Sequence, residues 1–96
     1  MKYGFHPEAE AEFLDAIEYY EGCKPGLGYE FAAEVHSTIG SILSFPNAWT
    51  ILEDGIRRCQ IRRFPCGIIY SQDRDVTFVL AVMHLHRDPD YWKNRV

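Results

Sequence analysis

The stretch Val76-Thr77-Phe78-Val79-Leu80-Ala81-Val82-Met83 decides the fold class, because it is apolar at almost every position. A strand with one face in water alternates apolar and polar residues, whereas a strand covered on both faces does not. We therefore predict a central strand over residues 76–83 that is covered on both sides. The turn formers of residues 72–75 precede it, and a partner strand is predicted over 67–71.

A third strand is predicted over residues 56–63, where the period is two. Cys59 and Ile61 point to one face, and the polar residues alternate with them, namely Arg58, Gln60 and Arg62. Residues 64–67 contain a proline and a glycine and break this strand from the next one. We expect the arginine side of the sheet to remain free to bind another molecule.

The first half of the chain has the helical period instead. A short first strand is predicted over residues 2–6, and Pro7 suits the first turn of a helix that Gly22 ends. A second helix is predicted over 27–43, with Pro46 beyond its end, and the short connection makes the two helices antiparallel. The buried stripes are Ala9, Phe13, Ala16, Ile17 and Tyr20 in the first helix, and Leu27, Phe31, Val35, Ile39, Ile42 and Leu43 in the second. The predicted fold is α+β, a single domain over residues 1–96 in the order β-α-α-β-β-β, with a helical hairpin on one face of a small, mainly antiparallel sheet.

Composition and charge exclude several function classes. The chain has 96 residues, 47% of them hydrophobic, which excludes a disordered tail, and a net charge of −4, which excludes a generic polyanion binder. No uncharged run approaches the length of a membrane span, and we see no secretory signal, so we expect no membrane association and a cytoplasmic location. Basic residues nevertheless cluster between Asp54 and Asp73. The candidates for nucleic-acid or partner binding are Arg57, Arg58, Arg62, Arg63 and His84, although arginines that only solvate a sheet face are an equally good interpretation.

Three cysteines, Cys23, Cys59 and Cys66, are an odd number, which disfavours a disulfide framework. His84 and His86 are predicted to share one face of a strand and, together with Cys59 and Cys66, are candidate metal ligands by residue type. The spacing of the two cysteines, however, is not that of a zinc knuckle. We favour buried, inert thiols and expect no metal and no cofactor.

Short motifs follow one another in a fixed order along nearly the whole chain. They are His6-Pro7-Glu8-Ala9-Glu10-Ala11-Glu12, Tyr19-Tyr20, Pro25-Gly26-Leu27-Gly28 with Phe31 and Val35, Phe45-Pro46, Arg62-Arg63-Phe64-Pro65, Gly67-Ile68-Ile69-Tyr70, Ala81-Val82-Met83-His84, Arg87-Asp88-Pro89 and Tyr91-Trp92. This ordered set resembles the RelE/ParE toxin superfamily, in particular its plasmid-stabilisation, ParE-like branch. The fold of that family has the same β-α-α-β-β-β order.

The resemblance implies the toxin half of a type II toxin–antitoxin module. Members are neutralised by a cognate antitoxin whose C-terminal segment wraps the toxin as helix and strand. RelE-like members cleave messenger RNA on the ribosome as metal-independent endoribonucleases, whereas ParE-like members poison DNA gyrase. The resemblance leaves the oligomeric state open between a homodimer and a heterotetramer with the antitoxin.

The residues for RNA cleavage are only partly present. Such cleavage needs a base, an acid and cations around the phosphate. Arg58 lies near a lysine position of the RelE-like enzymes, but Gln60 and Gly67 stand where further cations are expected. His86, Arg87 and Tyr91 are the candidate catalytic residues if the chain is a ribonuclease; the alternative is that the tail merely folds back onto the sheet. We favour a gyrase-binding toxin over a ribonuclease, with an attenuated or orphan member as a third hypothesis.

Overall fold

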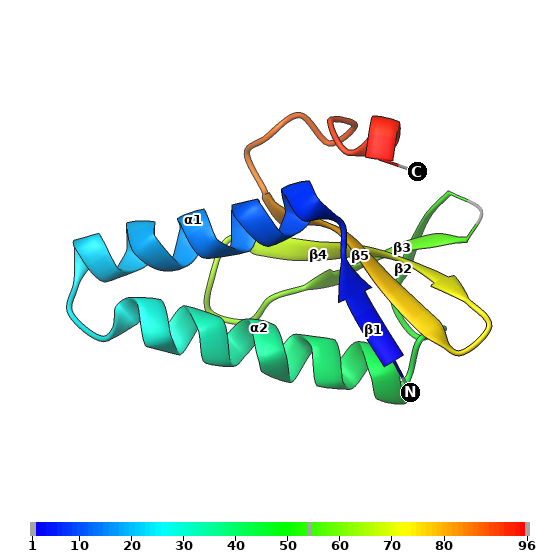
Figure 1. Ribbon diagram of the computed structural model, residues 1–96, viewed down its shortest axis with the longest axis horizontal. Coiled ribbons are helices and arrows are strands. Elements are labelled where there is room, and N and C mark those ends of the chain that lie inside the picture. The colour runs from blue at the N-terminus through cyan, green and yellow to red at the C-terminus, as the bar shows by residue number, and fades with distance from the viewer. Residues whose placement is uncertain (1, 54, 96) are drawn as a thin grey trace.

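The computed structural model describes residues 2–53 and 55–95. Figure 1 shows two antiparallel helices against a twisted sheet, with the C-terminal segment on the other side. The elements in chain order are β1 (Lys2–Phe5), α1 (Pro7–Cys23), α2 (Leu27–Ser44), β2 (Thr50–Glu53), β3 (Ile56–Gln60), β4 (Cys66–Asp73), β5 (Val76–His84) and the short 3-10 helix η1 (Lys93–Arg95). Within the described ranges, neither long helix is apolar enough over its length to cross a membrane.

The sheet has the order β1-β5-β4-β3-β2, so β5 lies inside it as the apolar stretch predicts. β1 pairs with β5 in parallel, and the other neighbouring pairs are antiparallel. The prediction omitted β2, and the observed order is β-α-α-β-β-β-β. This strand is short and mostly exposed, with Ile51 64% accessible, so its sequence carries no burial pattern that could have revealed it.

The helical hairpin forms through local contacts at its two turns. Pro7 is the first residue of α1, and the ring nitrogen Nδ1 of His6 accepts a hydrogen bond from the backbone of Glu8 at 3.1 Å. Between the helices, the Glu21 carboxylate accepts hydrogen bonds from the backbone N–H groups of Gly26 and Gly28. Gly26 has φ of 89°, a left-handed conformation that favours glycine. These contacts fix the antiparallel arrangement predicted from the short loop.

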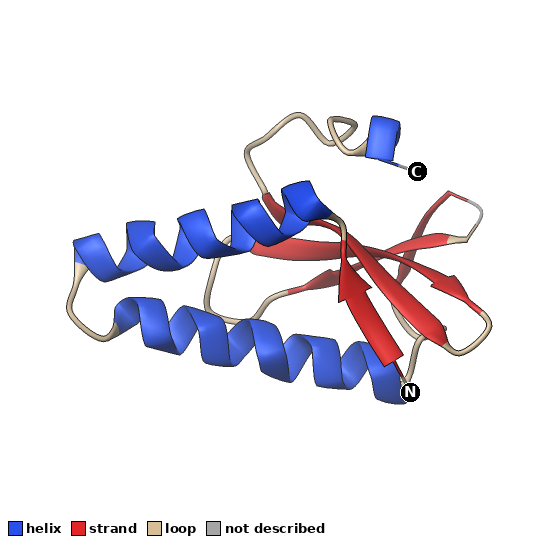
Figure 2. Ribbon diagram, in the orientation of Figure 1, coloured by secondary structure: helices blue, strands red, loops and turns tan. Residues whose placement is uncertain are grey.

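Two apolar clusters cover the two faces of the sheet. The cluster under the helices includes Phe13, Phe31, Val35, Ile68 and Val79, and further residues of both helices and β3 to β5. The second cluster lies on the opposite face, which we call the tail face because the tail, residues 85–95, covers it (Figure 2). The expectation that this face remains free is therefore wrong for most of its area.

Trp92 is the main side chain that covers the tail face. Its indole is 1% exposed and packs with Ile69, Leu80 and Met83, while its Nε1 donates to the carbonyl of Pro89 at 2.6 Å. A turn begins at Pro89, and η1 follows it. The tail thus supplies the second cover that a strand apolar on both faces requires.

Gly28 and Gly40 offer a matched test of helix packing. A Cβ at Gly28 would lie 2.6 Å from the backbone oxygen of Ile17, whereas one at Gly40 meets nothing within 4 Å. We expect Gly28→Ala to force α1 and α2 apart and to lower the free energy of unfolding by about 2–3 kcal/mol. Gly40→Ala should instead raise it by up to about 1 kcal/mol, because alanine favours the helix. Urea unfolding followed by circular dichroism measures both, and equal effects would contradict close packing at Gly28.

Candidate functional site

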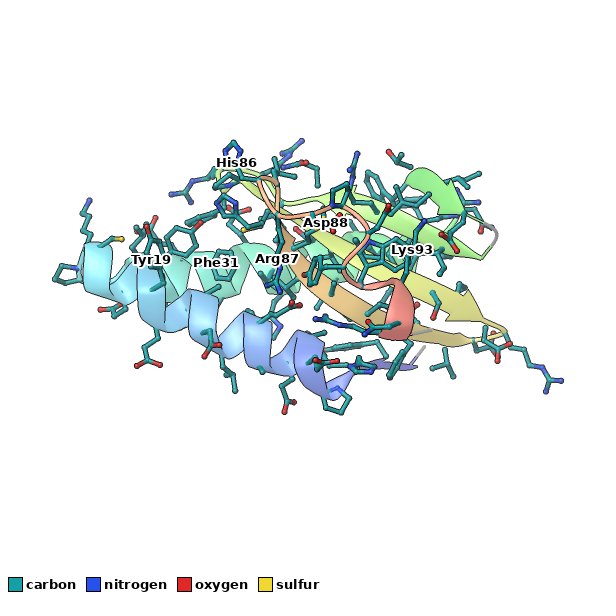
Figure 3. The ribbon with its side chains drawn as sticks, turned by 90° about the horizontal axis from the view of Figure 1, so that it is seen from above. Tyr19, Phe31, His86, Arg87, Asp88 and Lys93 are labelled. Atoms are coloured by element: carbon teal, nitrogen blue, oxygen red, sulfur yellow. The ribbon has the colours of Figure 1, made fainter. Side chains whose placement is uncertain are left out.

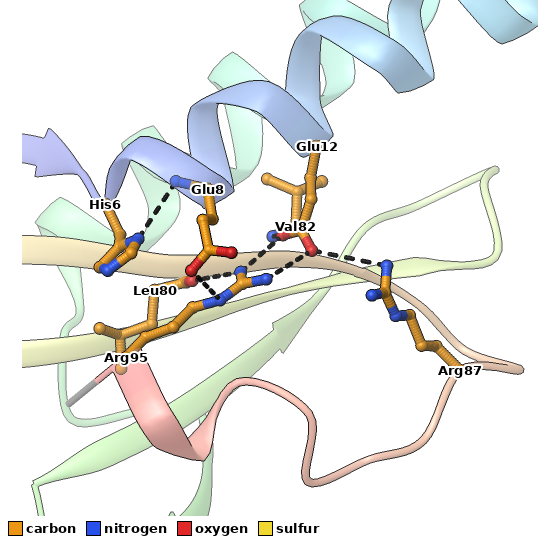
Figure 4. A network of polar contacts seen from close by, with 7 residues as sticks. All are labelled: His6, Glu8, Glu12, Leu80, Val82, Arg87 and Arg95. Atoms are coloured by element: carbon orange, nitrogen blue, oxygen red, sulfur yellow. Dashed lines mark hydrogen bonds and ion pairs between the residues drawn. The ribbon is translucent and has the colours of Figure 1, made fainter.

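Residues of the tail gather around one carboxylate on α1, that of Glu12. Arg95 binds it through two hydrogen bonds, Nη1 to Oε1 at 2.9 Å and Nη2 to Oε2 at 3.0 Å (Figure 4). The Arg95 side chain is only 6% exposed, and Glu8 lies 3.6 Å from its Nε. The hydrogen bonds to Glu12 raise the pKa of Arg95, so this guanidinium stays charged in its buried position.

The same two side chains also bind the backbone of β5. The N–H of Val82 donates to Glu12 Oε1 at 3.2 Å, and Arg95 Nη1 donates to the carbonyl of Leu80 at 2.9 Å. The register between β4 and β5 shifts here, because Ile69 pairs with Ala81 whereas Tyr70 pairs with Val79. Leu80 is therefore the extra residue of a β-bulge, and Arg95 binds the carbonyl that the bulge leaves without a ladder partner.

Arg87 and Tyr91 belong to this cluster. The guanidinium carbons of Arg87 and Arg95 lie 4.0 and 4.8 Å from the centroid of the Tyr91 ring, and Arg87 Nη1 is 3.7 Å from Glu12. The phenol oxygen of Tyr91 is buried and has no hydrogen-bond partner among the described residues. Burial and the nearby Glu12 raise the pKa of Tyr91, so its hydroxyl remains protonated near neutral pH.

His86 lies away from these two residues. Its ring centroid is 5.2 Å from that of His84, and its backbone N–H donates to the Nδ1 atom of His84 at 3.2 Å. In Figure 3, Arg87 extends toward α1 whereas His86 lies on the side away from that helix. The structure therefore brings the side chain of Arg87 close to that of Tyr91, and the ring of His86 close to that of His84. The two pairs are joined through the backbone, because the Arg87 N–H donates to the His84 carbonyl at 3.0 Å.

The four arginines named as binding candidates are dispersed in the structure. Arg57 donates to the Trp49 carbonyl at 2.8 Å, and Arg63 binds Glu30 and Glu34 of α2 at 2.7 and 3.5 Å. The stem of Arg58 lies over Gly67, 3.3 Å from where a Cβ would be, and Arg62 lines a hollow beside α2. Of these four arginines, Arg58 and Arg62 have no ion pair or side-chain hydrogen bond within the described part of the chain.

A groove runs between α1 and the end of β5. Its volume is about 370 Å³, and apolar atoms form most of its wall. The residues that line it are Glu12, Asp15, Ala16, Tyr19, Tyr20, Cys66, Val82, His84 and Arg87. The roles of Glu12 and Arg95 were not predicted from the sequence, although Glu12 offers one signal. It follows Ala9 by three residues and precedes Ala16 by four, so it borders the buried stripe of its helix.

Two of the three thiols are buried on strands, although Cys66 lies in the stretch predicted to break the sheet. Cys59 and Cys66 are free and buried on β3 and β4, while Cys23 is exposed. Burial raises the pKa of Cys59 to about 11, which makes its thiol unreactive at neutral pH. No group of three or more histidine, cysteine or acidic residues within 2–53 and 55–95 has the arrangement of a metal site.

The architecture and the sequence both match known proteins. A solved structure described as the chromosomal ParDE TA system from P. aeruginosa has a TM-score of 0.76, with 12% identity, over 90% of this chain and 97% of that one. At this identity the likeness establishes the fold. No curated protein sequence matches. The family model described as the ParE toxin of type II toxin–antitoxin system, parDE, matches residues 3–89, so the chain belongs to the ParE toxin family.

The pairing of Glu12 with Arg95 gives a direct test. Glu12→Gln removes the closer of the two carboxylates that face the buried guanidinium, and we expect it to lower the free energy of unfolding by about 2–3 kcal/mol. Glu10→Gln, on the exposed side of α1, removes the same charge and should change stability by less than about 0.5 kcal/mol. Urea titrations at neutral pH compare the two variants. A loss in Glu12→Gln no larger than in Glu10→Gln would contradict a structural role for the pair.

Proposed function

We propose that this ParE-family toxin acts by binding DNA gyrase, without a hydrolytic step of its own, and that a cognate antitoxin neutralises it. Membership of the ParE family is the observation that carries the proposal. The arrangement of the three candidate catalytic residues supports a binding protein over a ribonuclease.

The candidate groups for RNA cleavage are poorly placed for that chemistry. A general acid or base must reach the reacting oxygen, but the Tyr91 hydroxyl is buried and its pKa is raised. Arg87 stacks on Tyr91 and lies near Glu12, which partly offsets its charge. Gly67 provides no cation at its position. The ring of His86 lies beside that of His84. The arrangement favours a protein that binds its target over one that cleaves a phosphodiester.

The acidic residues of the helical hairpin also favour a protein target over RNA. Residues 1–34 contain eight acids against two lysines, and all eight acids lie on α1 or α2. An approach to ribosomal RNA brings this face near dense phosphate, which repels it. A protein target such as gyrase imposes no such cost. This comparison is a second support for gyrase as the target.

The gyrase proposal is tested with the purified chain. We expect supercoiling of relaxed plasmid by gyrase to fall at micromolar toxin, and cells that express the toxin alone to stop growing. A heat-denatured sample serves as control. Unaltered supercoiling together with new messenger RNA ends in primer extension, lost in His86→Ala, would establish the ribonuclease hypothesis instead. Unaffected growth and supercoiling would indicate an attenuated member.

Antitoxin capture has its own physical basis. Sheet edges expose backbone groups that accept an added strand. Arg58 and Arg62, which have no ion-pair partner among the described residues, suit an acidic or amphipathic partner segment. The candidate partner is the product of the neighbouring reading frame, expressed together with a tagged toxin. A short protein with a DNA-binding pattern at its start and an amphipathic end fits this role.

The contribution of the two arginines is measurable in that complex. We expect Arg58→Gln combined with Arg62→Gln to weaken antitoxin binding, and the loss to shrink as salt rises, because screening reduces the contribution of exposed charges. Lys24→Gln combined with Arg74→Asn removes the same charge elsewhere and serves as the control. Isothermal titration calorimetry at low and high salt compares the two. Equal affinities for both double variants would remove Arg58 and Arg62 from the interface.

A further inference from the structure

Two histidines accept a hydrogen bond from the backbone through the ring nitrogen Nδ1, and each lies where a strand ends. His6 follows β1, and its Nδ1 accepts from the N–H of Glu8 at 3.1 Å. His84 is the last residue of β5, and its Nδ1 accepts from the N–H of His86 at 3.2 Å. In both cases the donor lies two residues further along the chain. The two imidazoles therefore close the same kind of local turn, once at the start of α1 and once at the start of the tail.

Both turns require a neutral imidazole. An Nδ1 atom accepts a hydrogen bond only while it carries no proton, and protonation turns it into a donor that faces the backbone N–H. An imidazole in water takes up its second proton near about pH 6.5. The stability that each turn contributes is therefore present above this range, and it is lost as the pH falls through it.

The surroundings of His6 contain charges of both signs. The first turn of α1 carries Glu8 and Glu10, and the tail contributes Arg95, whose Nε is 3.6 Å from Glu8 (Figure 4). From β5 the apolar ring of Phe78 packs edge-on against the imidazole, with 6.2 Å between the centroids. A positive charge at this position also faces the positive end of the helix dipole. Protonation of His6 thus removes the hydrogen bond that caps α1 and places a cation where the helix disfavours one.

The surroundings of His84 are also mixed in charge. The ring of His86 lies beside it, at 5.2 Å between centroids. The other titratable or charged groups that line the same groove are Glu12, Asp15, Tyr19 and Tyr20 of α1, Cys66 of β4 and Arg87 of the tail. Within residues 2–53 and 55–95, neither His84 nor His6 forms an ion pair with a carboxylate. A proton that arrives on either ring therefore gains no close ion pair in place of the lost hydrogen bond.

The two turns hold the two ends of the tail. The tail begins directly after the turn at His84. Its last described residue, Arg95, binds Glu12 and lies 3.6 Å from Glu8, and both acids belong to the first two turns of the helix that His6 caps. Loss of both turns therefore weakens the tail at its beginning and at its end together.

We propose that the tail is an acid-sensitive cover, which protonation of His6 and His84 loosens in mildly acidic solution. The tail then separates more often from the sheet and exposes the apolar residues of the tail face, among them Ile69, Leu80 and Met83. The helical cluster on the other face keeps its own contacts, so the effect is a local opening of residues 85–95. The proposal does not depend on which target the toxin binds.

Hydrogen exchange of the Trp92 indole N–H, followed by NMR on the full chain, measures the opening of the tail. This N–H is buried and donates to the Pro89 carbonyl while the tail is closed. Rates at pH 7.5 and pH 5.5 are converted to protection factors, which removes the intrinsic pH dependence of exchange. We expect the protection factor of Trp92 to fall about tenfold at pH 5.5, because two hydrogen bonds that hold the tail are lost. An unchanged protection factor would overturn the proposal.

Asparagine separates the hydrogen bond from the titration, because its side-chain oxygen accepts the same local bond and takes up no proton in this range. In His6→Asn combined with His84→Asn we expect Trp92 to keep its protection at pH 5.5. His36→Asn combined with His86→Asn also removes two imidazoles, but neither ring accepts a hydrogen bond among the described residues, so the fall should persist. Equal falls in the two double variants would overturn the proposal. Should the first double variant fail to fold by circular dichroism, the single variants decide, and an undiminished fall in both overturns it.

Discussion

The ion pair between Glu12 and Arg95 connects three parts of the molecule that are far apart in sequence. Its carboxylate comes from α1, its guanidinium from the end of the tail, and both bind backbone groups of β5 at the point where a bulge interrupts the ladder. The bulge requires such partners, because Leu80 and Val82 lie beyond the end of β1 and have no neighbouring strand. The side chains of Glu12 and Arg95 take the place of a neighbouring strand, and their pairing fixes the position of the tail.

The position of the tail, in turn, determines what each face of the sheet can do. With Arg95 fixed against α1, Trp92 covers the apolar residues on the tail face, and β5 becomes buried on both sides. The face that is opposite the helices is therefore largely core, and binding surfaces are displaced to its margins. Arg58 lines a hollow at one such margin, and the groove between α1 and the end of β5 lies at another.

The sequence predicts the parts of this fold that rest on periodicity. The helices, the three strands predicted over 56–63, 67–71 and 76–83, and the inner place of β5 follow from apolar spacing, because burial imposes a period of 3.6 or 2. The structure places these strands at 56–60, 66–73 and 76–84, so β3 ends three residues earlier than predicted. β2 was missed because Ile51 is exposed and leaves no such pattern. Because residues 76–83 are apolar on both faces, the face opposite the helices must also be covered, and Trp92 in the tail covers it. The Glu12–Arg95 pair joins positions 83 residues apart, which no local pattern reports.

The distribution of arginines shows why a charge cluster in sequence is weak support for a charged surface. Arg57, Arg58, Arg62 and Arg63 are near neighbours in the chain, but successive strand residues point to opposite faces, and the loop after β3 turns Arg63 back to α2 in a left-handed conformation. Two of the four are thereby used within the fold. A nuclease needs its cations converged on one phosphate, whereas a protein-binding surface tolerates single charges at separate margins. The dispersal is therefore compatible with the binding of a protein target and an antitoxin, and it disfavours phosphodiester cleavage by this chain.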